Sequence, residues 1–211
     1  MEGFHQECAL ACSLQYKDPK DVSVVTHSSN VPMVVFEGTD TVRNWLRNVD
    51  CFANKKGVHN GFWSYAIWCI REYNLFEVFR RNEELILTGH SLGAAAAIIV
   101  RYIMRHQSTR VRLVLFGCPK VGTQEFREKF ARVANLSAVS FSKQEDPVPC
   151  LPFGCCKWGY VQTVDLTYIP FDKRSRYGHS IRAYCDVPLQ PISNLNLPID
   201  KSEAREGDDS I

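Results

Sequence analysis

The chain has 211 residues, of which 45% are hydrophobic and 23% are charged, and its formal net charge is +2. A chain of this length and apolar content can bury one sizeable core, so we expect a single compact domain. The nearly balanced charge gives no electrostatic reason to expect nucleic acid as a partner. Apolar runs such as Ala94–Val100 are far too short to cross a bilayer, so we expect no transmembrane segment.

Short apolar strands alternate with helices along the sequence. Residues 1–18 predict a first helix and not a secretory signal, because no positive charge precedes their apolar patch. The strands are predicted over Val31–Phe36, Glu84–Thr88, Val111–Phe116, Ala138–Ser142 and Val161–Ile169. Helical periodicity covers Phe62–Tyr73 and Ala94–His106. This alternation predicts an α/β fold with a mostly parallel central sheet flanked by helices.

The composition changes near the C-terminus. The sequence from Pro188 is first punctuated by prolines and then polar and charged, with little to bury. We therefore expect one folded domain over residues 1–190 and a disordered tail over 191–211.

Nine cysteines are scattered through apolar and loop contexts. With no signal peptide predicted, the simplest interpretation is a set of reduced, mostly buried thiols in a cytoplasmic protein that touches lipid surfaces only peripherally. A secreted form with disulfides is the first alternative. A zinc site built from Cys150, Cys155 and Cys156 is the second, although no further cysteine or histidine pair completes four ligands at the usual spacing.

The segment LILTGHSLG (85–93) contains a G-x-S-x-G motif centred on Ser91. The motif follows an apolar strand directly and opens into a helix, as a nucleophile elbow requires. The tight turn needs small residues two positions before and after the serine, and Gly89 and Gly93 supply them. A glycine-rich turn with an incidental serine is the alternative, but the strand, the glycines and the alanine run Ala94–Ala97 together favour a nucleophile.

A nucleophilic serine needs a histidine base and an acid that orients it, in the chain order serine, acid, histidine for this kind of fold. Among six histidines, only His179 lies far enough downstream of Ser91 to follow an acid. Asp146 is the preferred acid because it follows a predicted strand in a loop whose backbone is restrained by prolines. Asp165 is the second choice, and His90 is expected to serve packing or hydrogen bonding instead of acting as the base.

Six segments together resemble the class 3 lipases, the fungal-lipase-like branch of the α/β hydrolases. In chain order they are FEGTDTVRNWLRN, VHNGF, LILTGHSLGAA, LFGCPKVG, VSFSKQEDPVPCLP and GHSIRAY, and they cover most of residues 31–184. Their order is more specific than any single motif. The resemblance implies the α/β-hydrolase fold in a compact version, since the chain is short for the family.

The resemblance also implies an oxyanion hole and a lid. The oxyanion donors would be the backbone N–H groups of Thr39 and Leu92, with help from the Thr39 hydroxyl. The lid would be a short helix whose apolar stripe contains Val42, Trp45, Leu46 and Val49. The same stripe is equally consistent with a helix packed permanently on the core. Two departures from the family concern this region: Glu37 stands where an arginine is usual, and Asp40 flanks Thr39.

These observations predict a serine hydrolase that forms an acyl-enzyme and needs no metal or organic cofactor. A glyceride lipase acting on triacylglycerol or diacylglycerol is the preferred function. A phospholipase or a short-chain esterase with the same triad is the alternative, and an inactive lipase-like binding module is a further one. The expected partners are the ester substrate and, transiently, a lipid interface, without nucleic acid.

Overall fold

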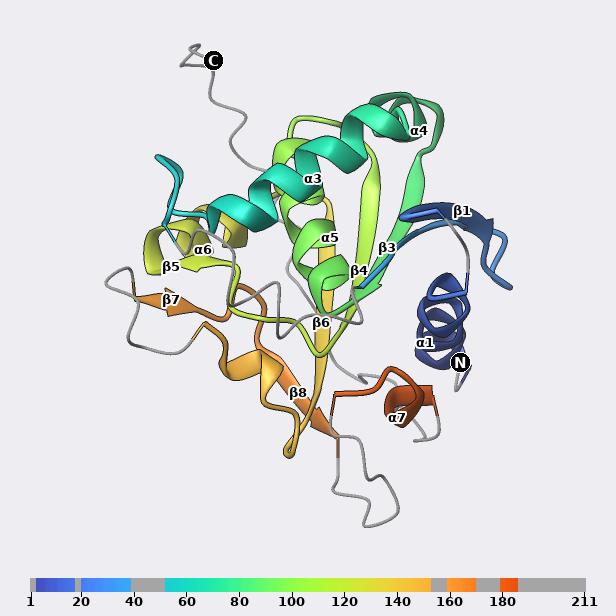
Figure 1. Ribbon diagram of the computed structural model, residues 1–211. Helices are drawn as coiled ribbons and strands as arrows, with labels where there is room; N and C mark the ends of the chain where they lie inside the picture. Colours follow the sequence, from blue (N-terminus) through green and yellow to red (C-terminus); the bar gives the residue numbers. More distant parts are fainter. Residues whose placement is uncertain (1–2, 18–19, 39–51, 153–158, 170–178, 186–211) are drawn as a thin grey trace.

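In the computed structural model, residues 3–17, 20–38, 52–152, 159–169 and 179–185 are described. Their centre is a six-stranded sheet whose strands lie in the same order in space as along the chain (Figure 1). The strands are β1 (Val22–Thr26), β2 (Pro32–Phe36), β3 (Glu84–His90), β4 (Arg110–Phe116), β6 (Leu136–Lys143) and β8 (Leu166–Ile169). Only β1 runs antiparallel, and the other five are parallel. The carboxyl ends of β2, β3, β4, β6 and β8 therefore meet at one edge.

The two faces of the sheet are covered by different helices. Alternate residues of each parallel strand point to opposite faces, so Leu85 and Leu87 join one core while Ile86 joins the other. The first core lies under α3 (Asn60–Glu72), α4 (Leu75–Arg81), α5 (Leu92–Ile103) and α6 (Gln124–Ala131). The second lies under α1 (Phe4–Gln15) and α7 (Arg182–Cys185), which lie side by side in Figure 1. Both faces of the sheet are thus buried, which explains its nearly continuous apolar strands.

Smaller elements surround the end of the sheet. A two-stranded sheet pairs β5 (Gly122–Thr123) with β7 (Tyr160–Val161). A 3-10 turn, η1 (Val148–Cys150), follows β6.

Helix α5 is buried from Leu92 to Tyr102, because it is enclosed between the sheet and α3, and its run of four alanines allows this close packing.

Four of the five parallel strands and three helices were predicted correctly from the sequence. The strands β2, β3, β4 and β6, and the helices α1, α3 and α5, are confirmed with ends that differ by a few residues. The prediction of one strand over Val161–Ile169 is wrong, because β7 ends at Val161 and β8 begins at Leu166 in another sheet. Strand β1 and helix α4 were not predicted.

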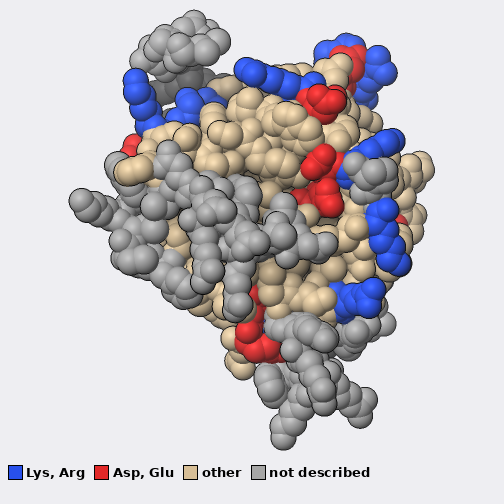
Figure 2. All heavy atoms as spheres, in the orientation of Figure 1, with Lys and Arg blue, Asp and Glu red and all other residues tan. Residues whose placement is uncertain are grey.

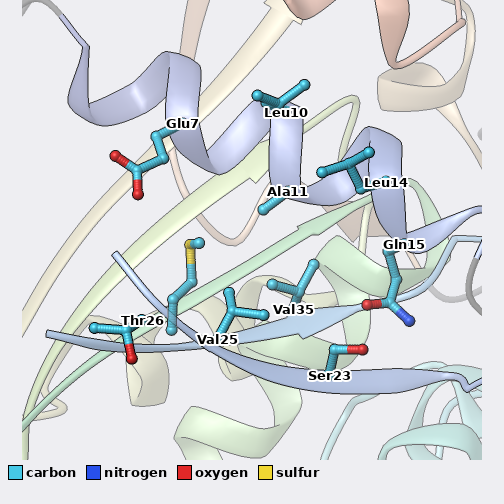
Figure 3. Close-up of a pocket in the computed structure, with 10 residues that line it drawn as sticks. Glu7, Leu10, Ala11, Leu14, Gln15, Ser23, Val25, Thr26 and Val35 are labelled. Carbon is cyan, nitrogen blue, oxygen red and sulfur yellow. The ribbon is translucent and has the colours of Figure 1, made fainter. Parts of the chain in front are cut away.

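Helix α1 also lines a groove of about 270 Å³ over β1 and β2 (Figure 3). Its apolar walls include Leu10 and Leu14 from the helix and Val25 and Val35 from the strands. None of Ser91, Asp146 and His179 lines it, so the groove is separate from the predicted catalytic residues.

Over the part of the chain that the structure describes, no helix is both long and apolar enough to span a membrane. The division into a domain over 1–190 and a tail over 191–211 stays a prediction, because residues 186–211 lie outside the described ranges.

Candidate active site

Ser91 occupies a sharp turn between β3 and α5. Its backbone has φ 57° and ψ −119°, a conformation that side-chain-bearing residues rarely adopt. A Cβ added to Gly89 would collide with the backbone of Gly93, and one added to Gly93 would collide with the carbonyl group of Phe36. The two glycines therefore let the helix start directly against the ends of β2 and β3, as a nucleophile elbow requires.

The backbone around Ser91 is tied to the neighbouring strand. The N–H of Ser91 donates to the carbonyl oxygen of Phe116 at 3.0 Å, which fixes the turn to the end of β4. Leu92 is the first residue of α5, so its N–H has no acceptor within the helix. This N–H is available as an oxyanion donor. Thr39, the other predicted donor, lies outside the described residues, as do the lid residues Val42, Trp45, Leu46 and Val49.

Asp146 and His179 form a hydrogen-bonded pair at the same edge of the sheet. The Nδ1 of His179 lies 2.9 Å from both carboxylate oxygens of Asp146. The carboxylate side chain is fully buried, whereas the imidazole is 24% exposed. Asp146 follows β6, and the N–H of Val148 in η1 donates to its Oδ1 at 2.9 Å. The proline-containing loop therefore holds the acid in one orientation, and the acid holds the histidine with Nδ1 toward it.

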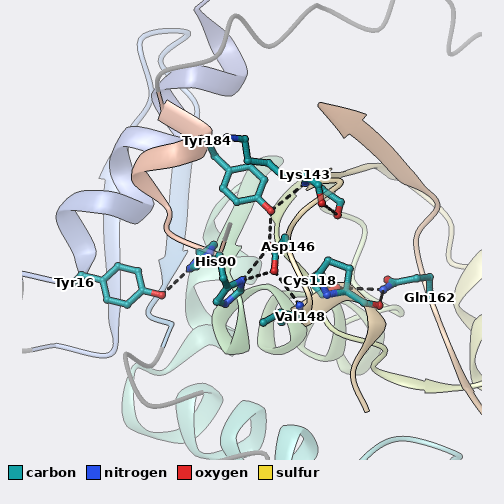
Figure 4. A network of polar contacts seen from close by, with 11 residues as sticks. Tyr16, His90, Cys118, Lys143, Asp146, Val148, Gln162 and Tyr184 are labelled. Atoms are coloured by element: carbon teal, nitrogen blue, oxygen red, sulfur yellow. Dashed lines mark hydrogen bonds and ion pairs between the residues drawn. The ribbon is translucent and has the colours of Figure 1, made fainter. Parts of the chain in front are cut away.

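Two further residues, Tyr184 (Figure 4) and Gly117, lie against Asp146. The hydroxyl of Tyr184 in α7 donates to Asp146 Oδ2 at 2.7 Å. Gly117, directly after β4, has φ 53°, and a Cβ there would lie 2.7 Å from that same Oδ2 and 3.2 Å from His179 Cε1. Glycine is therefore required at 117 both by the backbone conformation and by the closeness of the acid–base pair.

His90 packs between α1 and His179. Its ring lies 4.5 Å from the His179 ring at an interplanar angle of 30°, and its Nδ1 is 2.7 Å from the hydroxyl of Tyr16 (Figure 4). Burial, and then the nearby His179, lower the pKa of His90 well below the usual value. A neutral His90 therefore stacks on His179, which agrees with the packing and hydrogen-bonding role expected for it.

The hydroxyl of Ser91 and the free nitrogen of His179 are not hydrogen-bonded to each other. Ser91 Oγ and His179 Nε2 are both buried, and neither has a hydrogen-bond partner among the described residues. Looser geometry between a nucleophile and its base is common when no substrate is bound. The structure thus brings together the acid and the base, and it places the serine at the same sheet edge through His90, the residue before it.

The other predicted candidates lie away from this site. Asp165, the second choice for the acid, is 87% exposed and pairs with Arg127 at 2.7 Å. Within the described ranges, no group of three or more possible metal ligands comes together, and Cys155 and Cys156 of the zinc alternative lie outside those ranges. Glu37 is described, and its carbonyl oxygen accepts a hydrogen bond from the Tyr65 hydroxyl at 3.3 Å.

Three residues of the site were missed from the sequence: Tyr16, Gly117 and Tyr184. Tyr16, directly after α1, and Tyr184, in α7, are far along the chain from the residues they contact, and no local pattern marks such contacts. Gly117 did carry a signal, because a glycine directly after a predicted apolar strand indicates a tight turn or a close approach.

Comparison with known proteins identifies a family that matches most of the central part of the chain. Residues 33–155 match the family model described as Lipase (class 3). The chain belongs to the class 3 lipase family. The matched residues of this class 3 lipase include Ser91, Leu92 and Asp146, whereas His179 and Tyr184 lie beyond them. The resemblance drawn from the sequence motifs is therefore confirmed.

Individual relatives of this class 3 lipase are named for two substrate classes. The chain is 29% identical over 150 residues to the secreted mono- and diacylglycerol lipase A of Penicillium cyclopium, covering 65% of this chain and 47% of the relative. It is 31% identical over 97 residues to phospholipase A1-IIdelta of Arabidopsis thaliana, covering 44% and 23%. The chain thus spans about half the length, or less, of these curated relatives.

Solved lipase structures share its fold. A mutant of MDLA from Penicillium cyclopium superimposes with a TM-score of 0.60 at 26% identity, covering 73% of this chain and 60% of that one. The mono- and diacylglycerol lipase of Aspergillus oryzae gives a TM-score of 0.64 at 21% identity, covering 82% and 80%. The class 3 lipase chain therefore has the α/β-hydrolase fold, as predicted.

Proposed function

We propose that this chain hydrolyses carboxylic esters, with Ser91 as the nucleophile, His179 as the general base and Asp146 as the acid that orients the base. The observation that carries the proposal is the 2.9 Å pairing of Asp146 with His179 at the sheet edge where the strained turn presents Ser91. Membership of the class 3 lipase family supports the same chemistry.

The reaction follows from these positions. His179 Nε2 takes the proton of the Ser91 hydroxyl as Oγ attacks the ester carbonyl carbon, and Asp146 stabilises the imidazolium that forms. The N–H groups of Leu92 and Thr39 donate hydrogen bonds to the oxyanion, and each lowers the free energy of the transition state by on the order of 3 kcal/mol. His179 then protonates the leaving alcohol, and water, deprotonated by the same histidine, releases the acid. No metal or organic cofactor takes part in this scheme.

Glycerides are the proposed substrates. The Penicillium relative is named as a mono- and diacylglycerol lipase, which supports a neutral glyceride. The Arabidopsis relative is named as a phospholipase A1, which supports the alternative of a phospholipid. On the face drawn in Figure 2, described basic and acidic side chains are interspersed, in keeping with a neutral substrate.

Access to Ser91 requires a movement. The residue is 0% exposed, so an ester carbonyl can reach its hydroxyl only after a covering group moves aside. The apolar stripe Val42, Trp45, Leu46 and Val49 is the proposed cover, and opening at a lipid surface would expose it to lipid.

The test compares wild type with Ser91→Ala on p-nitrophenyl esters of increasing acyl length. We expect the variant to lose at least about a thousandfold in rate. Monoacylglycerol, diacylglycerol and phosphatidylcholine, each dispersed in the same detergent, then separate glyceride from phospholipid hydrolysis. An unchanged rate in Ser91→Ala would refute the mechanism. A folded wild type that neither hydrolyses these esters nor reacts with a fluorophosphonate probe would favour the binding module.

The redox state of the cysteines bears on the cellular compartment of the protein. The described cysteines Cys8, Cys12, Cys69, Cys118 and Cys150 are free thiols, which supports the cytoplasmic location proposed from the sequence. The word "secreted" in the name of the Penicillium relative supports the alternative. The cytoplasmic and secreted locations are distinguished by fractionating the source cells and counting the free thiols of this protein in each fraction.

A further inference from the structure

We propose that Tyr184 is a positioning residue for the reaction: its hydroxyl fixes the Asp146 carboxylate and sets how strongly that carboxylate holds His179. This inference rests on the proposed Ser91–His179–Asp146 mechanism and adds a residue to it. Tyr184 lies beyond the part of the chain that matches the family model.

The carboxylate of Asp146 is buried, and each of its two oxygens accepts a hydrogen bond from a different donor. Oδ1 accepts from the Val148 N–H at 2.9 Å, and Oδ2 accepts from the Tyr184 hydroxyl at 2.7 Å. The Nδ1 of His179 lies equally far, 2.9 Å, from both oxygens. One donor on each side therefore keeps the carboxylate symmetric toward the imidazole, and loss of either donor would turn it.

The hydroxyl of Tyr184 is itself aimed by its surroundings (Figure 4). The backbone N–H of Lys143 at the end of β6 points at the Tyr184 oxygen from 3.4 Å. With that N–H on the acceptor side of the oxygen, the O–H proton is left to donate to Asp146. The ring is 0% exposed and makes edge contacts with Phe116 at 5.7 Å and with His90 at 5.9 Å. The donor therefore has little freedom to turn away.

Tyr184 remains a donor throughout the working pH range. Burial, and then the charge of Asp146, raise the pKa of the Tyr184 hydroxyl well above its usual value. The hydroxyl therefore stays protonated and does not exchange protons with the substrate. Its effect on the reaction passes through Asp146 and His179.

Removing this donor changes the balance between Asp146 and His179. A buried carboxylate with one hydrogen bond fewer has less of its charge neutralised, so it attracts the protonated imidazole more strongly. The histidine would then hold its proton to higher pH and would return it less readily to the leaving alcohol. A purely structural tyrosine would not have this effect on pH dependence.

Other charged and titratable groups near the pair remain in place when Tyr184 is changed. His90 of β3 faces the His179 ring, and Tyr16, directly after α1, is hydrogen-bonded to His90. Lys143, the last residue of β6, pairs with Glu145 at 3.6 Å. Because these groups do not change, a shift in the pH profile can be assigned to the lost hydroxyl.

The experiment compares wild type, Tyr184→Phe and Tyr102→Phe, all in the full chain. Tyr102 is a matched control: it is also buried, it packs edge-on against Phe126, and it is in α5 away from the acid–base pair. The measurements are kcat and KM for a soluble p-nitrophenyl ester from pH 5 to 9, with the melting temperature of each protein. For Tyr184→Phe we expect a kcat about tenfold to a hundredfold lower, an unchanged KM and an acid limb of kcat/KM moved to higher pH.

Each outcome decides one of the two proposals. If Tyr184→Phe keeps the kcat and the acid limb of Tyr102→Phe, or loses activity only in proportion to unfolding at the assay temperature, the role of Tyr184 is refuted. If wild type and Ser91→Ala hydrolyse the ester equally, the mechanism itself fails, and this is seen without any tyrosine variant.

Discussion

At the scale of single residues, the site depends on a glycine that carries no chemistry. Gly117→Ala would place a Cβ 2.7 Å from Asp146 Oδ2. We expect kcat to fall about a hundredfold, because the carboxylate must turn away from His179. Gly159→Ala is the matched control: its φ of 57° imposes the same backbone penalty of about 1–2 kcal/mol, but an added Cβ there meets nothing within 4 Å. Equal kcat values for the two variants would contradict this account.

The burial of His90 leads us to expect that the free energy of unfolding depends on pH. Its pKa is lowered in the folded protein, chiefly by burial, so below about pH 6.5 the unfolded chain binds a proton that the folded chain does not. The free energy of unfolding therefore has its full value above this pH and falls by up to about 1.4 kcal/mol per pH unit below it. His5 shifts in the same direction, by burial and then His27, and adds to the slope.

Urea unfolding between pH 5 and 8 measures this slope. In His90→Asn the slope below pH 6.5 should be smaller than in wild type, although not zero because His5 remains. The exposed His106→Gln should leave it unchanged. A wild-type slope in His90→Asn would show that His90 is protonated in the folded state.

The proposed catalytic residues were easier to find from the sequence than the residues that contact them. Ser91 stands out because the elbow needs a fixed local pattern, and chain order leaves only His179 as its base. Tyr184 is 38 residues from Asp146 and Tyr16 is 74 from His90, so only the folded sheet brings them together. Residues whose role arises from such contacts have no signature along the chain.

At the scale of elements, the start of α5 is constrained by the end of β2. In an ordinary helix, glycine to alanine stabilises by up to about 1 kcal/mol. For Gly93→Ala we expect the opposite sign, a loss of about 2–4 kcal/mol, because the added Cβ would collide with the Phe36 carbonyl. Gly3→Ala, with nothing within 4 Å of the added Cβ, should stay within about 1 kcal/mol of wild type. Chemical denaturation of both variants checks the difference, and a stabilised Gly93→Ala would refute it.

Whether an element could be predicted depended on its surroundings. Strands β3 and β4 are mostly buried, so each contains a short apolar run that is easily recognised. Strand β1 is at the edge, with three of its five residues exposed, and its sequence therefore carries a weaker signal. The segment Val161–Ile169 looked like one strand because apolar residues flank a short turn. Gln162 in that turn instead donates to the carbonyl oxygens of Cys118 and Pro149, linking two loops.

At the scale of the whole molecule, burial predicts the order in which thiols react. Cys8, Cys12, Cys69 and Cys118 are buried, and desolvation raises the pKa of Cys12 to about 12. Cys150 is exposed. With iodoacetamide at pH 8 we expect Cys150 to be alkylated in the native protein, and the four buried thiols only after unfolding. Mass spectrometry of each cysteine against denaturant concentration measures this, and early alkylation of Cys12 would show that α1 detaches from the sheet.

The order of the strands has a consequence for how the molecule is made. From β2 to β8, each strand of the six-stranded sheet lies next to the strand of that sheet that was synthesised before it, so a chain emerging from the ribosome can extend the sheet one strand at a time. Ser91 is then in place while Asp146 and His179 are still to be translated. The nascent protein would then hold Ser91 in a finished turn before the proposed base exists, and the proposed reactivity would arise only once the segment that carries His179 and α7 has been made.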